Sequence, residues 1–528
     1  MRSRSGLGTV LAVAAACAAV LTAPAQALAA PGDGTGGLPT YRTAEDAEKV
    51  KGTTSSANGP QLKTGVYTDS IGAGQKLYYS VTLDSKSSAF LSAVVAPKPG
   101  TKVAYGDGIT VTLQDTGGND CSTSNPTFSS GEQARPIADY ATRRIEEDGD
   151  CQTAGPYYFV VERTSDPASD AGRWPMELKY MSEPGIKSGS TTPPAEGSWS
   201  SASPTPPSGS ARRRAGGTGF NDAPALTDGV WKDRLKPGET RFYRMPLDWG
   251  QQLSAAAELA NASMTLDSGY AATGLDVQLY NTARGAVSAR SEGYDGKQQT
   301  ADLGPTAPAG FNNRFDASDD EVSGMRFAGW YYLAVSLNPE VGKFTTGAVD
   351  LTLRLTVKGE PKDGPQYVGD ETKAGFGVSD ADREQAEKGQ TAAAAEESDS
   401  KKLVAYAGIG VGVVLLLGLG GWTLAARRRA PGAATPGEHP GGGSPQGGGH
   451  GGGDPQGGSR QAANPPGGRQ PDGHRQDGHR QDGHRQDGHR QDGHRQDGHR
   501  QDGHRQDGHQ QGGNQQGGNQ QYGPPPGW

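Results

Sequence analysis

Two stretches of this chain, 164 residues apart, are copies of one unit. Residues 62–84 and 226–248 carry identical or similar residues at thirteen matched positions, among them Gly65 and Gly229, and Asp69 and Asp233. A sequence that repeats at a fixed spacing predicts two copies of one fold. The chain must therefore build the same domain twice.

The matched stretches have the pattern of β-strands. Further along, 108–113 aligns with 274–279, and 154–161 aligns with 328–335. Apolar and polar residues alternate, aromatic and β-branched residues are frequent, and Gly, Pro and Asp separate the runs, which is typical of antiparallel strands. We therefore expect an all-β protein with two tandem antiparallel β-sandwich or jelly-roll domains. Three pairs should superpose: Tyr79 on Tyr243, Leu83 on Leu247, and Tyr158 on Tyr332.

The repeated unit resembles the bacterial pre-peptidase C-terminal domain. The resemblance rests on the Gly-x-[Tyr/Trp]-x-Asp opening at Gly65 and Gly229, on Leu-Asp-Val-Gln-Leu-Tyr-Asn at 275–281, and on Gly-Trp-Tyr-Tyr-Leu-Ala-Val at 329–335. It implies β-sandwich accessory modules of secreted proteins. The Asp that usually precedes the aromatic strand is missing in both copies. The layout of the whole chain is also similar to that of single-pass membrane proteins of actinobacteria.

Two apolar segments predict export and one membrane anchor. Residues 1–30 have the charge pattern and small-residue cleavage pattern of a signal peptide. Residues 403–426 are 24 residues without a charge, long enough at about 1.5 Å per residue to cross a hydrocarbon core of about 30 Å. Arg427, Arg428 and Arg429 follow, and arginines beside a span favour the cytoplasmic side. We expect a protein in the cell membrane with its N-terminus outside and its C-terminus in the cytoplasm.

The remaining segments are poor in core-forming residues. We assign them to an N-terminal lead segment, a Pro/Ser/Gly linker, a polar stalk and a disordered cytoplasmic tail. The complete division of the chain is 1–30 signal peptide, 31–61 lead segment, 62–182 first sandwich, 183–225 linker, 226–358 second sandwich, 359–402 stalk, 403–426 transmembrane helix and 427–528 tail.

Charge narrows the class of outer partner. The chain has a net charge of −8, and since the tail from Arg427 and residues 1–30 each carry +2, residues 31–426 carry −12. An acidic exterior argues against nucleic acid or anionic lipid as a partner outside the cell. A cell-wall polymer or another envelope protein fits better.

Cys121 and Cys151 predict a disulfide bond. Cys17 lies inside the signal segment, which leaves these two as the cysteines of the exported part. Disulfides persist outside the cell, and a bridge that closes about 30 residues contributes about 3 kcal/mol by loop-entropy reasoning.

The distribution of histidine residues argues against an enzyme. No histidine precedes His439, so a Ser-His-Asp or Cys-His apparatus cannot form outside the membrane. A carboxylate pair could still support glycoside hydrolysis, and a surface enzyme of that type is the third hypothesis.

Acidic runs offer a hypothesis for calcium. Glu146 and Glu147 precede the last aromatic strand of the first unit, and Asp320 and Glu321 precede that of the second. Clustered carboxylates supply the hard oxygens that Ca²⁺ needs. The alternative is that these are solvated acidic loops. Neither run fits the calcium-loop pattern.

Trp249 is a candidate ligand platform. It lies in Asp248-Trp249-Gly250, which has the composition of a turn, where an indole ring could stack on a sugar. Trp231 and Trp330 occupy strand positions shared with the other copy, and core packing explains them better.

The tail and the apolar segment add two more hypotheses. The tail repeats Asp-Gly-His-Arg-Gln, and a histidine-rich tract can chelate Ni²⁺, Zn²⁺ or Cu²⁺. Replication slippage produces the same perfect repeat without selection. The repeated histidines are His474, His479, His484, His489, His494, His499, His504 and His509. Gly408 and Gly412 form a small-xxx-small pair that could pack two helices into a homodimer.

Together these observations predict a single-pass cell-envelope protein that displays two non-catalytic β-sandwich modules with a binding or structural role. The alternative is a metal-responsive or signalling membrane protein that acts through its histidine-rich tail.

Overall fold

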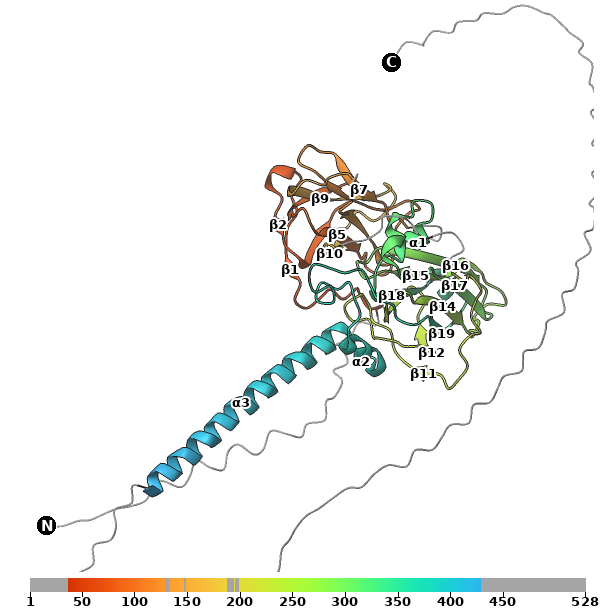
Figure 1. Cartoon of the computed structure of the whole chain (residues 1–528). Coiled ribbons are helices and arrows are strands. Elements are labelled where there is room, and N and C mark those ends of the chain that lie inside the picture. The colour runs from red at the N-terminus through yellow and green to blue at the C-terminus, as the bar shows by residue number, and fades with distance from the viewer. Residues whose placement is uncertain (1–36, 129–132, 147–148, 188–193, 195–198, 429–528) are drawn as a thin grey trace, which may run out of the picture. The chain divides into compact units, whose positions relative to one another are not determined.

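A computed structural model describes residues 37–128, 133–146, 149–187, 194 and 199–428. Figure 1 shows strands over most of this range, followed by two helices at its C-terminal end. The described residues between 48 and 358 are mostly β-strand and form two sandwiches, as predicted, in which most strand pairs are antiparallel.

The first sandwich consists of two five-stranded sheets. One sheet, named here the inner sheet of the first sandwich, has the order β1-β3-β10-β5-β8, and the other, its outer sheet, has the order β2-β4-β9-β6-β7. The strands are β1 Glu48–Lys49, β2 Gln61–Leu62, β3 Gly65–Ile71, β4 Lys76–Leu83, β5 Ser88–Val95, β6 Gly108–Gln114, β7 Asp120–Ser124, β8 Ile137–Arg143, β9 Gly155–Thr164 and β10 Trp174–Glu183. A 3-10 turn, η1, covers Ser56–Asn58.

The second sandwich repeats this plan. Its inner sheet has the order β13-β18-β15-β16, and its outer sheet has the order β11-β12-β19-β14-β17. The strands are β11 Arg212–Arg213, β12 Gly229–Leu235, β13 Thr240–Leu247, β14 Gln252–Leu259, β15 Ala271–Tyr280, β16 Ala286–Tyr294, β17 Gln299–Pro305, β18 Gly329–Leu337 and β19 Val349–Lys358. The short helices are η2 Phe311–Phe315, α1 Asp320–Gly324 and η3 Pro339–Lys343.

The strand register confirms the repeat. In the first sandwich Leu83 pairs with Gly155 and Ser80 pairs with Tyr158. In the second, Leu247 pairs with Gly329 and Arg244 pairs with Tyr332. The superpositions predicted for Tyr79, Leu83 and Tyr158 follow from these pairings.

Alternation along the strands separates core from surface. In β14 every second residue is buried, from Leu253 to Leu259, and in β4 the buried residues are Leu77, Tyr79, Val81 and Leu83. Each sandwich has its own core cluster between its two sheets. Burial of these side chains is the main favourable contribution to each domain.

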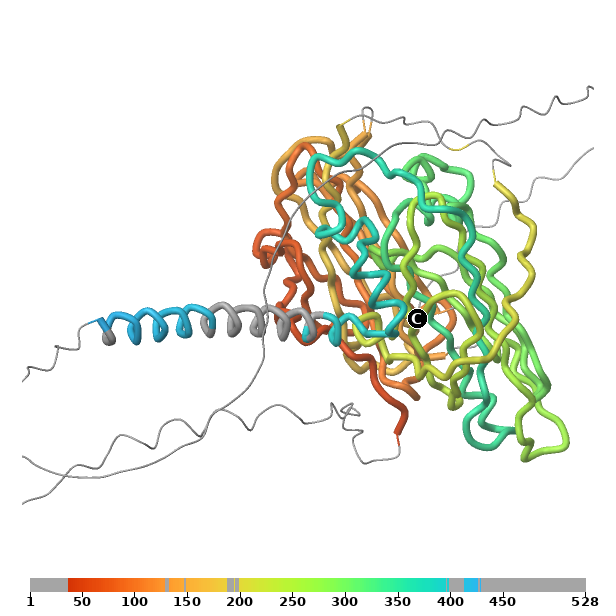
Figure 2. The backbone as a smooth tube through the Cα atoms, turned by 60° about the horizontal axis from the view of Figure 1, so that its bottom comes forward, coloured from red at the N-terminus to blue at the C-terminus, as the bar shows by residue number. Residues whose placement is uncertain are grey.

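The two sandwiches pack face to face through their inner sheets. Phe90 and Met181 of the first sandwich contact Ala283 and Phe327 of the second in one apolar cluster. A second cluster joins Val94 and Ala138 to apolar side chains of β13, β15 and β18. Figure 2 shows the two domains side by side, the first in orange and the second in green. They therefore form one packed body.

This packing is asymmetric with respect to the repeat. The inner sheet of the first sandwich corresponds in sequence to the outer sheet of the second, because β3, β5 and β10 align with β12, β14 and β19. Equivalent sheets therefore face different environments. One copy buries the outward side of this sheet against its neighbour, and the other copy leaves it exposed.

Two segments that the sequence analysis assigns to linker and stalk take part in the fold. Arg212–Arg213 form β11, which pairs in parallel with β12 as β1 pairs with β3. Tyr367 and Phe376 are buried against the sandwiches.

The helices follow. The capping box of Ser379 and Asp382 begins α2, Asp380–Lys388. The next helix, α3 Ala392–Arg428, contains the predicted segment 403–426. Of the helices in the described part of the chain, none combines the length and the apolar character that crossing a membrane requires.

Candidate functional site

A polar groove of about 530 Å³ runs between the two sandwiches. Its first wall comes from β7 and β8, and its second wall comes from β16, α1 and one residue of β15. Hydroxyl groups dominate the lining, which includes Ser122, Thr123, Ser124, Asp139, Thr142, Gln278, Ser288, Ala289, Asp320, Glu321, Ser323 and Arg326. Neither sandwich makes this groove alone.

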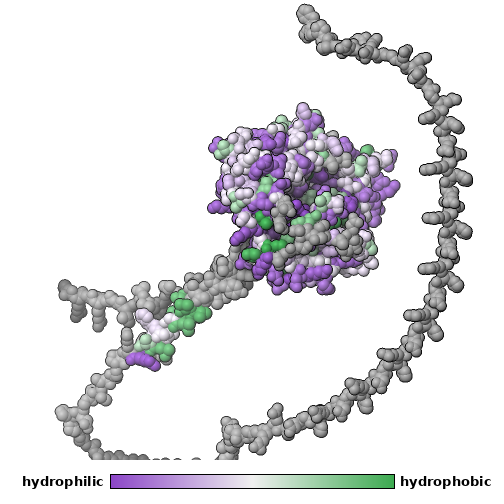
Figure 3. Space-filling model, turned by 45° about the horizontal axis from the view of Figure 1, so that its top comes forward, coloured by the Kyte–Doolittle hydropathy of each residue, from purple (hydrophilic) through white to green (hydrophobic). Residues whose placement is uncertain are grey.

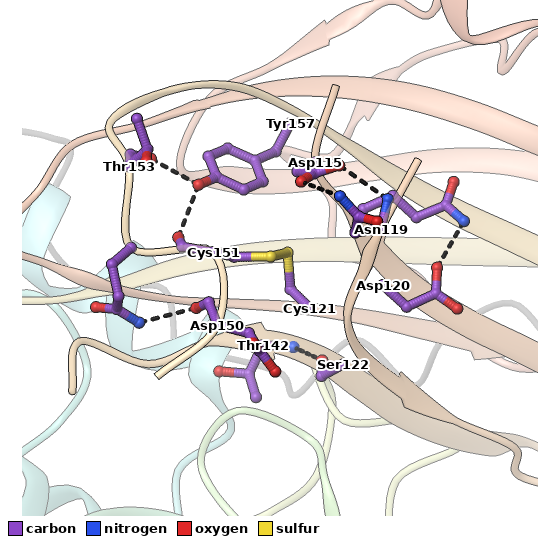
Figure 4. The surroundings of a disulfide bond; sticks show 12 residues. Asp115, Asn119, Asp120, Cys121, Ser122, Thr142, Asp150, Cys151, Thr153 and Tyr157 are labelled. Carbon is purple, nitrogen blue, oxygen red and sulfur yellow. Dashed lines mark hydrogen bonds between the residues drawn. A yellow bond between two sulfur atoms is a disulfide. The ribbon is translucent and has the colours of Figure 1, made fainter. Parts of the chain in front are cut away.

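The disulfide fixes the first wall. Cys121 on β7 is bonded to Cys151, so the predicted bridge is confirmed. Figure 4 shows Tyr157 beside the disulfide. The Tyr157 hydroxyl lies within hydrogen-bonding distance of two carbonyl oxygens, that of Cys151 at 2.7 Å and that of Thr153 at 2.6 Å, and donates to them. The bridge ties the short edge strand β7, which pairs with β6 alone, to the loop before β9.

Two serine side chains of β7 join this strand to β8 of the other sheet. The backbone N–H of Thr142 donates to Ser122 Oγ at 2.6 Å (Figure 4). The Ser124 hydroxyl donates to Asp139. Since β7 and β8 belong to different sheets, these bonds close the edge of the sandwich and present its hydroxyl groups to the groove.

The second wall is organised around Glu321. Its Oε1 accepts from Ser288 Oγ at 2.8 Å and from Arg290 Nη1 at 3.2 Å. Asp319 caps α1 by accepting from the backbone N–H of Val322 at 3.0 Å. The helix thus holds Glu321 over β16.

The Asp139 carboxyl lies in the groove and has a raised pKa. Loss of solvation raises the pKa of Asp139 to about 6. Other interactions act in the opposite direction and lower it, among them the hydrogen bonds from Ser124 and from the backbone N–H of Tyr140, and the charge of Arg326. The Tyr140 bond is 2.8 Å long. Part of the Asp139 population is therefore protonated in mildly acidic solution.

The groove can bind a ligand rich in hydroxyl groups. Serine and threonine hydroxyls both donate and accept, carboxylates accept, and the Gln278 amide does both. Such a set matches alternating donors and acceptors on a polyol and needs no net ligand charge.

The acidic residues proposed for calcium are partly engaged elsewhere. Glu146 pairs with Arg144 at 2.6 Å, and Glu321 makes the contacts with Ser288 and Arg290 given above. Asp320 is the first residue of α1, and Glu147 lies outside the described residues. Within the described part of the chain, no group of three or more His, Cys, Asp or Glu side chains could hold a metal ion. The paired calcium sites stay a prediction.

Trp249 is buried, with 7% of its surface exposed, and packs with Ala328 and Tyr367. It borders a second cleft of about 540 Å³ that Trp199 and Phe311 also line. The segment around residue 364 covers the indole, because its Nε1 lies where a Cβ on Gly364 would be. An open platform is therefore not what Trp249 provides.

The other two tryptophans of the second sandwich have different roles. Trp231 is in the core, as expected, with the Arg212 guanidinium 3.7 Å from its ring centroid. Trp330 is half-buried on the inner sheet and donates from Nε1 to Asp382 at 2.9 Å.

The remaining predicted site residues are not tested. All the repeated histidines, from His474 to His509, lie outside the described residues. Gly408 and Gly412 lie in α3, and helix-helix dimerisation stays a prediction.

Sequence reasoning missed most of the groove. Asp320 and Glu321 were singled out, but for calcium, and the run Cys-Ser-Thr-Ser at 121–124 was a further signal. A polar run on a strand usually means a solvated face, and nothing local places Ser288 and Glu321 opposite it.

Comparisons with known proteins add the following. No family model matches the chain, and no curated protein matches it. Solved structures that match the chain include tripeptidyl peptidase 2, at 8% identity and TM-score 0.17, covering 56% of this chain and 24% of that one. The tandem CBM22-1-CBM22-2 domains of Xyn10C from Paenibacillus barcinonensis match at 11% identity and TM-score 0.16. This match covers 60% of the present chain and 100% of the Xyn10C chain. The M60 catalytic domain with CBM51-1 and CBM51-2 from Clostridium perfringens ZmpB matches at 8% identity and TM-score 0.14. This match covers 58% of the present chain and 38% of the ZmpB chain. At these TM-scores the likenesses carry no inference about activity or ligand.

Proposed function

We propose that this chain is a non-catalytic binding protein of the cell envelope and that the groove between its sandwiches holds a neutral, hydroxyl-rich polymer of the cell wall. The observation that supports this most directly is that two packed sandwiches line one groove with hydroxyl, amide and carboxylate groups. Binding sites occur preferentially at such domain junctions.

The rigidity of the groove favours binding. Apolar clusters join the two sandwiches, and buried ion pairs cross the same interface. A ligand that meets preformed walls loses less free energy to ordering than one that must bring two mobile domains together.

We also propose that residues 403–426 anchor the protein in the membrane, with the sandwiches outside. The segment has no charged residue and is followed by three arginines. The described turns of α3 expose large apolar side chains, among them Leu416 at 74% and Trp422 at 78%. Figure 3 shows hydrophobic residues in green on this helix. A helix that exposes such side chains needs an apolar partner, and lipid is one.

The anchor is tested by protease treatment of intact cells from which the wall has been removed. Protease should digest residues 31–400 and spare the Asp-Gly-His-Arg-Gln tract. A digested tail with protected sandwiches would reverse the topology.

The groove is tested by titrating the full-length protein in lipid nanodiscs with soluble glycan fragments of the wall. Ala289 on β16 is exposed and lines the groove, so Ala289→Trp should block it and weaken binding about tenfold or more. The matched control is Ala272→Trp, at an exposed position of the neighbouring strand β15 away from the groove. Equal affinity in both variants, or no binding to any glycan, would refute the proposal.

A further inference from the structure

The second sandwich carries a basic groove of about 390 Å³ at the edge of its outer sheet, on the face that the first sandwich does not cover. Six cationic side chains line it: Arg213, Arg214, Lys232, Arg234, Lys236 and Arg241. Only two carboxylates share the lining, Asp233 and Glu239. This local excess of positive charge lies in a region, residues 31–426, whose net charge is −12.

Strand geometry brings the cations together. In the parallel pair β11–β12, Arg213 lies opposite Lys232, so their side chains share one face of the sheet. Lys232 and Arg234 are two residues apart in β12, and Lys236 continues the same period. Because residues at i and i+2 are about 6.7 Å apart along a strand, the cations form a regularly spaced row.

The two carboxylates are already used within the protein. Asp233 Oδ2 accepts from the Tyr243 hydroxyl at 2.7 Å and from the backbone N–H of Gly216 at 2.8 Å. Glu239 accepts from the backbone N–H of Lys236 at 2.9 Å and pairs with Arg241 at 2.7 Å. They stabilise the turn and the strand edge, and with six cationic side chains against two carboxylates the lining keeps a net positive charge.

Several cationic groups lack a partner in the described part of the chain. Arg213, Lys232 and Lys236 are exposed, and their side chains make no hydrogen bond or ion pair there. Arg214 and Arg241 are partly engaged, because Arg214 Nη1 donates to the carbonyl oxygen of Gly389 at 3.3 Å and Arg241 Nη1 donates to that of Gly216 at 2.9 Å, while their Nε atoms are buried without an acceptor. Arg234 forms an ion pair with Asp350 at 2.9 Å, and both side chains of this pair are more than half exposed to solvent.

The first sandwich shows that the fold does not require this charge. The hydrogen-bonded scaffold is the same in the two copies. In the first, Asp69 accepts from the backbone N–H of Gly52 and from the Tyr79 hydroxyl. In the second, Asp233 accepts from the backbone N–H of Gly216 and from the Tyr243 hydroxyl. At five aligned positions, however, the first copy has uncharged residues where the second has cations: Val50 for Arg214, Thr68 for Lys232, Ser70 for Arg234, Gly72 for Lys236 and Leu77 for Arg241.

Some basic residues do remain in the first copy. Lys49 and Lys51 occupy the matching lead segment, and Arg173 bonds to Ser70 Oγ at 2.9 Å and to Gln75 at 2.6 Å. The row along the strand is nevertheless particular to the second copy. This sheet packs against the neighbouring domain in the first copy and is exposed in the second, so the cations occupy the copy in which the face is open to a ligand.

We propose that this groove binds a soluble polymer whose anionic groups are phosphodiesters or phosphates. Guanidinium groups bind phosphate oxygens through paired N–H donors, and lysines add point charges. A regularly spaced row fits a ligand with repeating charge better than a single small anion. The groove is also recessed, since the Arg241 side chain is only 23% exposed while that of Arg234 is 60% exposed. A chain can enter it, whereas a flat lipid surface reaches only its rim.

The proposal is tested on the full-length protein in zwitterionic nanodiscs, with inorganic polyphosphate as the probe. The triple variant Lys232→Thr, Arg234→Ser, Lys236→Gly places first-sandwich residues on the second, so it should fold. We expect its affinity for polyphosphate to fall about tenfold or more. The slope of log affinity against log salt should become shallower by about 2–3, because each lost phosphate contact removes about 0.7–0.9.

The matched control removes the same charge elsewhere. Lys297, Lys343 and Lys373 are exposed and lie outside the groove, and their triple change to Thr should leave polyphosphate affinity within about twofold. A second variant, Ala215→Trp, fills the groove from an exposed lining position without any change of charge and should also weaken binding.

Two further ligands, inorganic monophosphate and phosphatidylglycerol vesicles, show which kind of anion the groove binds. Inorganic monophosphate should bind much more weakly than the polymer. If phosphatidylglycerol vesicles bind better than polyphosphate and the triple variant abolishes that binding, the groove is a membrane contact and the polymer proposal is wrong. It is equally wrong if both triple variants lose the same affinity, because binding then follows net charge alone.

Discussion

Glu183 at the end of β10 accepts two parallel hydrogen bonds from Arg314 of η2, each 2.7 Å long. The two side chains are 1% and 3% exposed, so the ion pair is sealed inside the interface between the sandwiches. The Tyr367 hydroxyl adds a bond of 2.8 Å to the same carboxylate. One buried acid thus connects the first sandwich, the second sandwich and the segment that follows them.

Glu183→Gln should lower the free energy of unfolding by about 3–5 kcal/mol, because it leaves the buried Arg314 cation without its counter-charge. Urea denaturation measures the change. Glu340→Gln breaks an exposed pair with Lys343 and should cost about 0–1 kcal/mol. Similar values for the two variants would mean that solvent reaches the Glu183–Arg314 pair.

Removal of the disulfide should destabilise the first wall of the groove. Cys121→Ser with Cys151→Ser opens a loop of 30 residues, and we expect a loss of about 3 kcal/mol. Thermal unfolding with and without reductant measures it. Reductant should shift the parent protein toward the double variant and leave the variant itself unchanged.

The repeat predicts matched costs at equivalent tyrosines. The hydroxyls of Tyr79 and Tyr243 each donate to an aspartate, at 2.8 Å and 2.7 Å, and burial raises the pKa of both phenols. Tyr79→Phe and Tyr243→Phe should each cost about 1.5–3 kcal/mol, the range for a hydrogen bond to a charged group. Tyr105→Phe, at a position 76% exposed, should cost almost nothing.

Asp139 predicts a dependence of stability on pH. Loss of solvation raises its pKa from 3.8 to about 6 in the folded protein, so the folded state holds the proton more tightly than the unfolded state. The stabilising contribution is present below pH 4 and is lost as the pH rises through 6. Asp139→Asn should flatten this part of the curve of unfolding free energy against pH.

The matched comparison is Asp115→Asn. Hydrogen bonds from the side chain and backbone of Asn119 lower the pKa of Asp115, so its contribution is present at neutral pH and is lost on acidification. The two variants should change the curve in opposite directions. A parent curve with no Asp139-dependent change between pH 4 and 6 would contradict the assignment.

Much of the fold could be predicted because its signals are local. Alternation gave the strands, and the repeat gave their register, including the pairs of Tyr79 and Leu83 with their counterparts. The disulfide followed from the cysteine positions and the export signal. The role of Trp249 could not be predicted, since only the fold shows that Tyr367 and the segment around Gly364 cover its ring.

The sequence alone determined two copies of one sandwich, because strand period and turn residues act over a few neighbours. Tertiary structure decided which faces of those copies meet. Glu177, Glu183 and Phe90 have outward strand positions like those of exposed residues, yet the second sandwich buries all three. Arg213 and Lys232 are 19 residues apart, and they share a groove because β11 pairs in parallel with β12. Both candidate sites arise from contacts between distant segments, and such contacts leave no local pattern in a sequence.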